Sequence, residues 1–234
     1  MTDSPVIRLR GVTKIYDKSG VPVHALRGVD LDIVRGEFAT LAGPSGSGKT
    51  TLLNIIGALD HPNAGEVEVA GRDLARMHRG DAAQFRLDNV GFIFQAYNLV
   101  PVLTAYENAE FTLLLRGAPP SKRKRVVQPL LERVGLGDMM HRKPHELSGG
   151  QQQRVAVVRA LATSPSIVLA DEPTANLDSE SSEALLVLMA ELNRELDTTF
   201  LFSSHDPVVI ERARRVIGLL DGRVDGRRPT SRPT

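Results

Sequence analysis

A short glycine-rich stretch from Gly43 to Thr51, GPSGSGKTT, constrains what this chain can fold into more than any other feature. It fits the phosphate-loop pattern, in which two glycines five positions apart are followed by lysine and a hydroxyl residue. The sequence from Glu37 to Ala42 predicts a buried strand before it, and Thr50 to Leu59 predicts a helix after it. This order of strand, loop and helix is the context that a nucleotide-binding loop requires. A plain glycine-rich turn is the alternative interpretation.

The residues of the loop have complementary uses if it wraps a triphosphate. Glycines let the backbone turn its N–H groups inward, and the helix behind them points the positive end of its dipole at the anion. Lys49 is placed to reach the β- and γ-phosphates, Thr50 to bring its hydroxyl to Mg²⁺, and Thr51 to bond the α-phosphate. The predicted phosphate-binding residues are Gly43, Ser45, Gly46, Ser47, Gly48, Lys49, Thr50 and Thr51.

The bulk composition bounds the class of protein. With 234 residues, the chain is long enough for one large domain or for a domain with a modest insert. Its net charge of +1 points neither to nucleic acid nor to an anionic membrane surface. The absence of cysteine excludes a disulfide framework and thiolate metal sites. There is no signal-peptide pattern and no run of about 18 apolar residues, so the chain itself is expected to be cytosolic and not to span a membrane.

An acidic pair, Asp171 and Glu172, ends the apolar run from Ile167 to Ala170. Two carboxylates at the end of a buried strand are costly unless they hold a cation or carry out proton chemistry. Asp171 is therefore expected to hold Mg²⁺ through its water shell, and Glu172 to orient or deprotonate a water that attacks the γ-phosphate. Gln95 and His205 likewise follow predicted buried strands, where α/β sheets place their ligand chemistry.

Two further features each allow two interpretations. Tyr16 lies in the turn after the first of several short predicted strands, where it is a core residue or an aromatic face on which adenine stacks. The stretch from Leu147 to Gln151, with Ser148 as its N-cap, opens a helix and forms a second anion site or no more than a capped helix.

With these motifs in this order behind a phosphate loop, the chain resembles the ATP-binding subunits of ABC transporters over residues 6 to about 225. The resemblance implies an α/β fold, a P-loop ABC-type ATPase core with a mixed β-sheet, an antiparallel β subdomain and an inserted α-helical subdomain at about 96–160. Residues 1–225 are expected to form this single ABC ATPase domain. The Pro- and Arg-rich tail, residues 226–234, is expected to be disordered.

The resemblance also implies a role for each motif, with ATP and Mg²⁺ as cofactors. Tyr16 is similar to the aromatic residue that stacks on adenine, and Gln95 to the glutamine that senses Mg²⁺ and the transmembrane partner. Glu172 is similar to the catalytic base, and His205 to the switch histidine that bonds the γ-phosphate. The implied catalytic residues are Glu172, His205, Lys49 and Gln95, and the implied Mg²⁺ residues are Thr50, Gln95 and, through water, Asp171.

Such proteins share each ATP site between two copies. The signature stretch of this family resembles Leu147 to Gln151 and completes the active site of the opposite protomer in a head-to-tail homodimer. The residues implied to bind ATP in trans are Ser148, Gly149, Gly150, Gln151 and Asp178.

Three segments are similar to the lipoprotein-release and macrolide-export ATPases, namely Leu52 to Asp60, Phe94 to Pro101 and Ser203 to Pro207. The similarity implies an Mg-dependent ATPase that dimerises on ATP and drives a separate membrane permease, by mechanotransmission of the export or lipoprotein-release type. The permease is expected to hold it on the inner face of the cell membrane and to contact Tyr97, Asn98 and Leu99.

Two alternatives remain. One is a regulatory ABC ATPase that gates a cell-wall hydrolase, as in cell division. The other is a soluble ABC-type ATPase that acts on nucleic acid. The lack of a long coiled-coil insert and of a basic stripe speaks against the second alternative.

Overall fold

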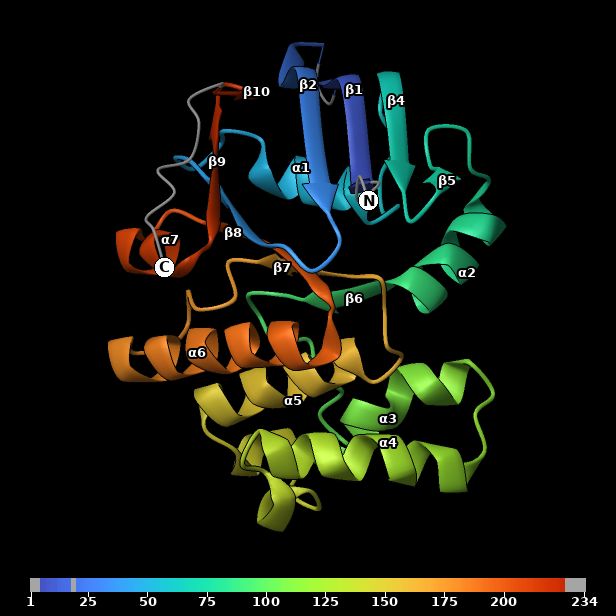
Figure 1. The fold of residues 1–234 in the computed structure, drawn as a ribbon, viewed down its shortest axis with the longest axis vertical. Helices are drawn as coiled ribbons and strands as arrows, with labels where there is room; N and C mark the ends of the chain where they lie inside the picture. The colour runs from blue at the N-terminus through green and yellow to red at the C-terminus, as the bar shows by residue number, and fades with distance from the viewer. Residues whose placement is uncertain (1–4, 18–19, 226–234) are drawn as a thin grey trace.

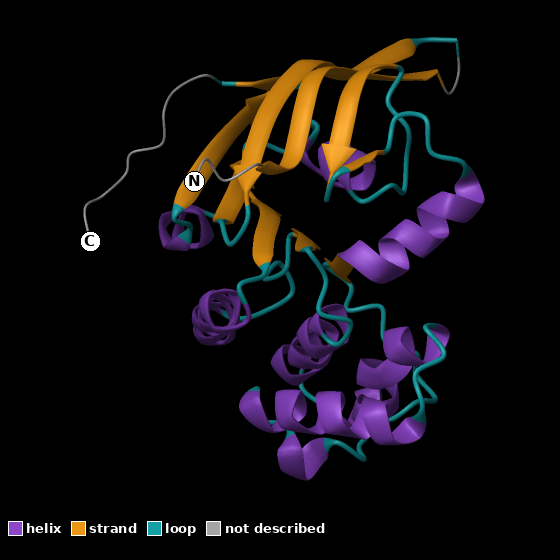
Figure 2. Ribbon diagram, turned by 45° about the vertical axis from the view of Figure 1, so that its right-hand side comes forward, coloured by secondary structure: helices purple, strands orange, loops and turns teal. Residues whose placement is uncertain are grey.

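An antiparallel sheet, a mixed sheet and a group of helices build this α/β fold, as the sequence predicts (Figure 1). The computed structural model describes residues 5–17 and 20–225, so the expected disorder at 226–234 lies outside the described residues. The antiparallel sheet lies over α1 (Lys49–Ile56) in the upper part of the view. Most helices lie in the lower part, beyond the mixed sheet (Figure 2).

The antiparallel sheet has the strand order β2-β1-β4-β5. Its strands are β1 (Pro5–Asp17), β2 (Pro22–Val34), β4 (Ala64–Val69) and β5 (Arg72–Asp73). The prediction of short strands is wrong for β1 and β2, which each run for 13 residues. The reason is a bulge at Gly11, whose positive φ of 57° lets β1 continue with a shifted register. Leu9 and Val12 are both buried as a result, although they break the alternation that a flat strand requires.

The mixed sheet has the order β10-β9-β3-β8-β7-β6. Every neighbouring pair in it is parallel except the final hairpin of β9 and β10. Because parallel strands end at the same edge of a sheet, the residues that follow β3, β7 and β8 gather in one place. The strands are β3 (Phe38–Ala42), β6 (Val90–Ile93), β7 (Ile167–Asp171), β8 (Thr199–Ser204), β9 (Arg215–Leu220) and β10 (Arg223–Val224).

The predicted helical insert is present between β6 and β7. It comprises α3 (Ala105–Leu115), α4 (Pro120–Arg133), the 3-10 turns η1 (Gly137–Met139) and η2 (Pro144–Glu146), and α5 (Gly149–Leu161). The remaining helices are α2 (Arg79–Asn89), α6 (Ser179–Leu196) and α7 (Pro207–Arg212). Across residues 5–17 and 20–225, no helix combines the length and the apolar character needed to cross a bilayer.

Side chains of the central strands alternate between two hydrophobic cores. Leu169 and Leu201 belong to the core that includes α1 and the antiparallel sheet. Phe200 and Phe202 belong to the core that includes the helices, and Phe38 packs with Phe202 at a ring-centroid distance of 5.0 Å. The mixed sheet therefore lies between the two cores and is buried on both faces, as expected for parallel strands.

A buried asparagine fixes the loop that follows β6. Asn108 is 1% exposed, and its Nδ2 donates to the carbonyls of Val100 (3.2 Å) and Leu103 (3.0 Å). Its Oδ1 accepts the N–H of Val100 at 2.7 Å. One buried side chain thus takes the place of the backbone hydrogen bonds that this irregular loop lacks.

We expect Asn108→Ala to lower the free energy of unfolding by about 2–3 kcal/mol, because it removes the hydrogen-bond partner of the Val100 N–H and of the Leu103 carbonyl and leaves a gap in place of a buried side chain. Asn89→Ala is the matched control, since Asn89 donates one hydrogen bond, to the Phe85 carbonyl of its own helix, and should cost less than about 1 kcal/mol. Urea unfolding of both variants measures the difference. Equal losses would contradict the role given to Asn108.

Candidate nucleotide site

The phosphate loop lies between β3 and α1, as predicted. Gly46 and Gly48 have positive φ angles of 80° and 105°, which turn successive N–H groups toward one side. Gly48 is the N-cap of α1, and the helix carries no acidic residue in its first turn. Within the described part of the chain, the Ser47 Oγ is buried and has no hydrogen-bond partner. The loop therefore presents unsatisfied donors and the positive end of a helix dipole.

Lys49 is buried, with only 7% of its side chain exposed, and its charge is held by the loop itself. The ammonium Nζ donates to the carbonyls of Gly43 (2.7 Å) and Pro44 (3.0 Å). It also lies 3.9 Å from Glu172 Oε1. The two carbonyl oxygens and the Glu172 carboxylate compensate the buried charge and hold the ammonium near the edge of the sheet.

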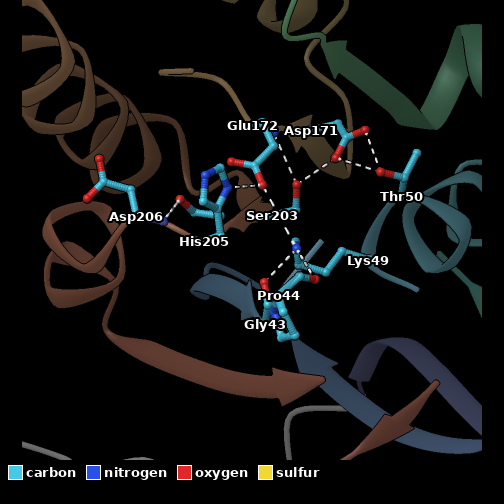
Figure 3. A network of polar contacts seen from close by, with 10 residues as sticks. Gly43, Pro44, Lys49, Thr50, Asp171, Glu172, Ser203, His205 and Asp206 are labelled. Atoms are coloured by element: carbon cyan, nitrogen blue, oxygen red, sulfur yellow. Dashed lines mark hydrogen bonds and ion pairs between the residues drawn. The ribbon is translucent and has the colours of Figure 1, made fainter. Parts of the chain in front are cut away.

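Three polar side chains meet Asp171 and Glu172 at that edge (Figure 3). Thr50 Oγ1 donates to Asp171 Oδ2 at 2.9 Å. Ser203 Oγ donates to Asp171 Oδ1 at 2.6 Å and accepts the N–H of Glu172 at 3.0 Å. Glu172 Oε1 lies 2.9 Å from His205 Nδ1. The structure thus joins four predicted site residues into one network, and Ser203 is a member that the sequence did not predict.

The residues present fit a nucleoside triphosphate with Mg²⁺. The buried Ser47 hydroxyl without a partner and the uncapped start of α1 both supply donors for an anion. A hydroxyl beside a single carboxylate, Thr50 with Asp171, is a small oxygen-donor set. Mg²⁺ is commonly held in this way, because it keeps several waters and takes other ligands from the phosphates.

Tyr16 lies inside β1, paired with Val23, and not in the turn that the sequence predicts. The bulge at Gly11 extends β1 past the expected end. Tyr16 is only partly buried, so it is not a core residue. Its hydroxyl donates to Asp60 Oδ2 at 2.7 Å, and Lys14 Nζ lies 4.9 Å from the centroid of its ring. Partial burial and the Asp60 carboxylate raise the pKa of Tyr16.

Gln95 follows β6, the strand next to β7, which ends at Asp171. The register pairs Ile93 of β6 with Ala170 of β7. Gln95 lies two positions after Ile93, and Glu172 lies two positions after Ala170. Gln95 is exposed, and its carbonyl accepts a hydrogen bond from Asn176 Nδ2 at 2.9 Å.

The stretch from Ser148 to Gln151 begins α5 with a capping box. Ser148 Oγ accepts the Gln151 N–H at 3.3 Å, and Gln151 Oε1 accepts the Ser148 N–H at 2.9 Å. Asp178 is the N-cap of α6 and accepts the N–H and the hydroxyl of Ser181, which lowers the pKa of Asp178. Among the described residues, no hydrogen bond or ion pair joins either stretch to the phosphate loop of the same chain.

A groove opens beside the loop that carries Gln95. Its volume is about 610 Å³, and α2, β6, α3 and the end of α5 contribute to its walls. Apolar side chains dominate the lining, and Leu59 and Leu115 are 47% and 60% exposed. The sequence did not predict this groove, because its walls come from separate elements.

Arg159 links the groove to the segment expected to receive a permease. It lines the groove, and its guanidinium donates to the carbonyls of Tyr97 (2.8 Å) and Asn98 (2.5 Å), while burial lowers its pKa. Of the three expected contact residues, Asn98 lines the groove. Leu99 packs against the core of the helical part, and Tyr97 donates a hydrogen bond to the Asn176 carbonyl.

The chain was compared with families of known proteins. The ABC transporter family matches residues 26–175. The lipoprotein-releasing system ATP-binding protein LolD of Anaeromyxobacter dehalogenans is 46% identical over 222 residues, which are 94% of this chain and 93% of that protein. The macrolide export ATP-binding/permease protein MacB 1/2 of Paracoccus denitrificans is 45% identical over 232 residues. These are 99% of this chain but 35% of that protein, so the chain spans about a third of its length.

A solved structure with a similar fold is the ATP-binding cassette MJ0796 in a dimeric, post-hydrolysis state bound to ADP and Pi. It superposes with a TM-score of 0.87 at 42% sequence identity. The match covers 97% of this chain and all of that chain. The predicted fold, with its mixed sheet, antiparallel subdomain and helical insert, is confirmed by this likeness.

The contacts of Asp60 predict a pH-dependent stability. Burial acts to raise the pKa of Asp60, but hydrogen bonds from Lys14 and Tyr16 outweigh it and hold the pKa below its usual range. A lowered pKa in the folded state gives stability that is present above the unfolded pKa of about 3.9 and is lost as the pH falls further. Asp60→Asn should therefore lower the free energy of unfolding at pH 7, by an amount that shrinks below pH of about 4.

Denaturant unfolding at a series of pH values measures this dependence. Asp138→Asn is the control, because Asp138 is exposed. It should change the free energy of unfolding little at any pH. An Asp60→Asn difference that stays the same at acidic pH would contradict the assignment.

Proposed function

The chain belongs to the ABC transporter family, and from this premise we propose that its network of polar side chains hydrolyses ATP to drive a separate membrane permease. The chain is an Mg-dependent ABC ATPase cassette related to export-type subunits. The observation that carries the proposal is the convergence of Lys49, Thr50, Asp171, Glu172 and His205 at one edge of the mixed sheet.

The phosphate loop binds the β- and γ-phosphates in this proposal. The N–H groups of Gly46 and Gly48, the Ser47 hydroxyl and the start of α1 supply donors to the phosphate oxygens. Lys49 moves from the carbonyls of its own loop to the phosphates, which are stronger acceptors for a buried ammonium. Tyr16 offers one face of its ring to adenine, with Lys14 beside it.

When bound, Mg²⁺ supplies positive charge against the phosphate oxygens as the bond to the γ-phosphorus breaks. Thr50 and Asp171, together with Gln95, would hold it. Glu172 orients the attacking water and accepts its proton. His205 keeps Glu172 in place through their contact and bonds the γ-phosphate.

The second half of each site comes from another copy of the chain. In one chain the residues from Ser148 to Gln151 form a capped helix start, and no hydrogen bond among the described residues joins it to the phosphate loop of that chain. The N–H groups of Gly149 and Gly150 lie outside the capping box, so they remain available to an anion. Asp178 lies at the adjacent start of α6 and contributes to the same face. ATP then joins two copies head to tail.

The groove beside Asn98 receives a cytoplasmic helix of the permease. Its apolar lining and its exposed Leu59 and Leu115 suit the apolar face of an amphipathic helix. Phe92 and Phe94 both line the groove, with nearly parallel rings whose centroids are 5.6 Å apart. This partner holds the cassette on the inner face of the membrane. The relatives named for lipoprotein release and macrolide export favour this interpretation over the regulatory and nucleic-acid alternatives.

We expect Glu172→Gln to lower the ATP turnover of the purified protein by at least about a hundredfold, because it removes the group that accepts the proton of water. ATP should remain bound and stabilise the dimer, which gel filtration with ATP detects. Glu66→Gln changes an exposed carboxylate on β4 and should leave both measurements unchanged. Normal turnover without added dimer in Glu172→Gln would contradict the role given to Glu172.

We expect Leu115→Asp to reduce recovery of the permease with the cassette from detergent-solubilised membranes by about tenfold or more, because it places a charge in an apolar interface. Val187→Asp is the matched control, because Val187 is 43% exposed on α6 and lies outside the groove. The ATP turnover of the isolated cassette should not change in either variant. Undiminished recovery with Leu115→Asp would exclude the groove as the docking site.

A further inference from the structure

Ser203 occupies a distinctive place in the mixed sheet. It lies on β8, directly opposite Asp171 of β7, and is fully buried. Residues paired across parallel strands project to the same face of the sheet, so the Ser203 hydroxyl lies beside the Asp171 carboxylate. The phosphate loop follows the other neighbour of β8, which is β3.

The hydrogen bonds of Ser203 have only one possible direction. A hydroxyl has a single proton to donate. An ionised carboxylate can only accept a hydrogen bond, and a backbone N–H can only donate one. Ser203 Oγ therefore donates to Asp171 Oδ1 at 2.6 Å and accepts the Glu172 N–H at 3.0 Å. The first bond is short and charge-assisted, which makes it the stronger of the two.

Each bond restrains a different site residue. The bond to Asp171 Oδ1 fixes the rotation of the carboxylate and leaves Oδ2 facing the Thr50 hydroxyl at 2.9 Å. The bond from the Glu172 N–H holds a backbone with φ of 47°, in the left-handed region that residues other than glycine seldom adopt. This turn directs the Glu172 side chain toward His205.

We propose that Ser203 is a positioning residue that orients Asp171 and Glu172 together, so that Mg²⁺ affinity and the placement of the base depend on one hydroxyl. The inference rests on the proposed function, in which Asp171 holds Mg²⁺ through water and Glu172 acts on the attacking water. Ser203 itself touches neither the nucleotide nor the water.

Thr199 is the control position for Ser203, because its buried hydroxyl has only a structural role. It lies on the same strand and is also fully buried. Its hydroxyl accepts a backbone N–H, that of Gly36, at 3.0 Å. Thr199 lies four positions before Ser203 on the strand, a distance of about 13 Å. Loss of the Thr199 hydroxyl therefore removes a comparable buried hydrogen bond without reaching the carboxylates.

The test compares Ser203→Ala and Thr199→Val in the full chain. Both should lower the Tm by similar amounts. Only Ser203→Ala should lower kcat, by about tenfold or more, and raise several-fold the Mg²⁺ concentration that half-saturates binding of the fluorescent nucleotide mant-ATP. Binding of mant-ATP without Mg²⁺ should not change. Ser203→Cys, which keeps a weaker donor and acceptor on a slightly larger side chain, should shift the same quantities less and remains informative if Ser203→Ala does not fold.

The inference is overturned if Ser203→Ala keeps the parental kcat and Mg²⁺ dependence, or if Thr199→Val loses turnover to the same extent. Glu172→Gln, measured in parallel, separates this failure from that of the proposed function. Full turnover in Glu172→Gln would remove the proposed role of the base. Lost turnover in Glu172→Gln with parental behaviour in Ser203→Ala would remove only the role of Ser203.

Discussion

The parallel pairing of β3, β7 and β8 is the constraint on which the site depends. Ala42, the last residue of β3, pairs with Ser204, while Ser203 pairs with Asp171. The three strands therefore end level, and the loop that starts at Gly43 begins beside the carboxylates. Thr50 and Asp171 are 121 positions apart in the chain, yet their oxygens lie 2.9 Å apart. A shift of register by one residue would reverse the faces of the strand and disperse this chemistry.

This arrangement also offsets the free energy lost when charged side chains are removed from water at the buried edge of the sheet. Lys49 is almost fully buried, but its ammonium meets two carbonyls and lies near Glu172. Asp171 receives two hydroxyl donors, from Thr50 and Ser203. Because Asp171 and Glu172 already have partners, these two carboxylates are oriented before any ligand arrives, which is the condition for efficient electrostatic stabilisation.

The sequence predicts the features that have a local pattern of residues. It does not predict those that depend on how separate strands and helices pack together. The phosphate loop, Asp171 with Glu172, and His205 each follow an apolar run, so a local pattern locates them at strand ends. Ser203 has the same local pattern as any residue ending a strand, and its contacts follow only from the register of β7 with β8. Tyr16 was placed in a turn because a bulge, which breaks the alternation of side chains, hid the continuation of β1. The groove combines several elements and has no sequence pattern of its own.

Helix α5 carries one of the two proposed interaction surfaces at each end. Its first residues, from Gly149 to Gln151, belong to the stretch proposed to reach a second copy, and Arg159 near its last turn lines the groove. The helix has 13 residues and is about 20 Å long, and it packs along α3 and the floor of the sheet. A displacement of α5 along its axis moves both ends together. If both proposed contacts form and such a displacement favours one of them, thermodynamic reciprocity requires the membrane partner and the second cassette to alter each other's affinity by the same factor.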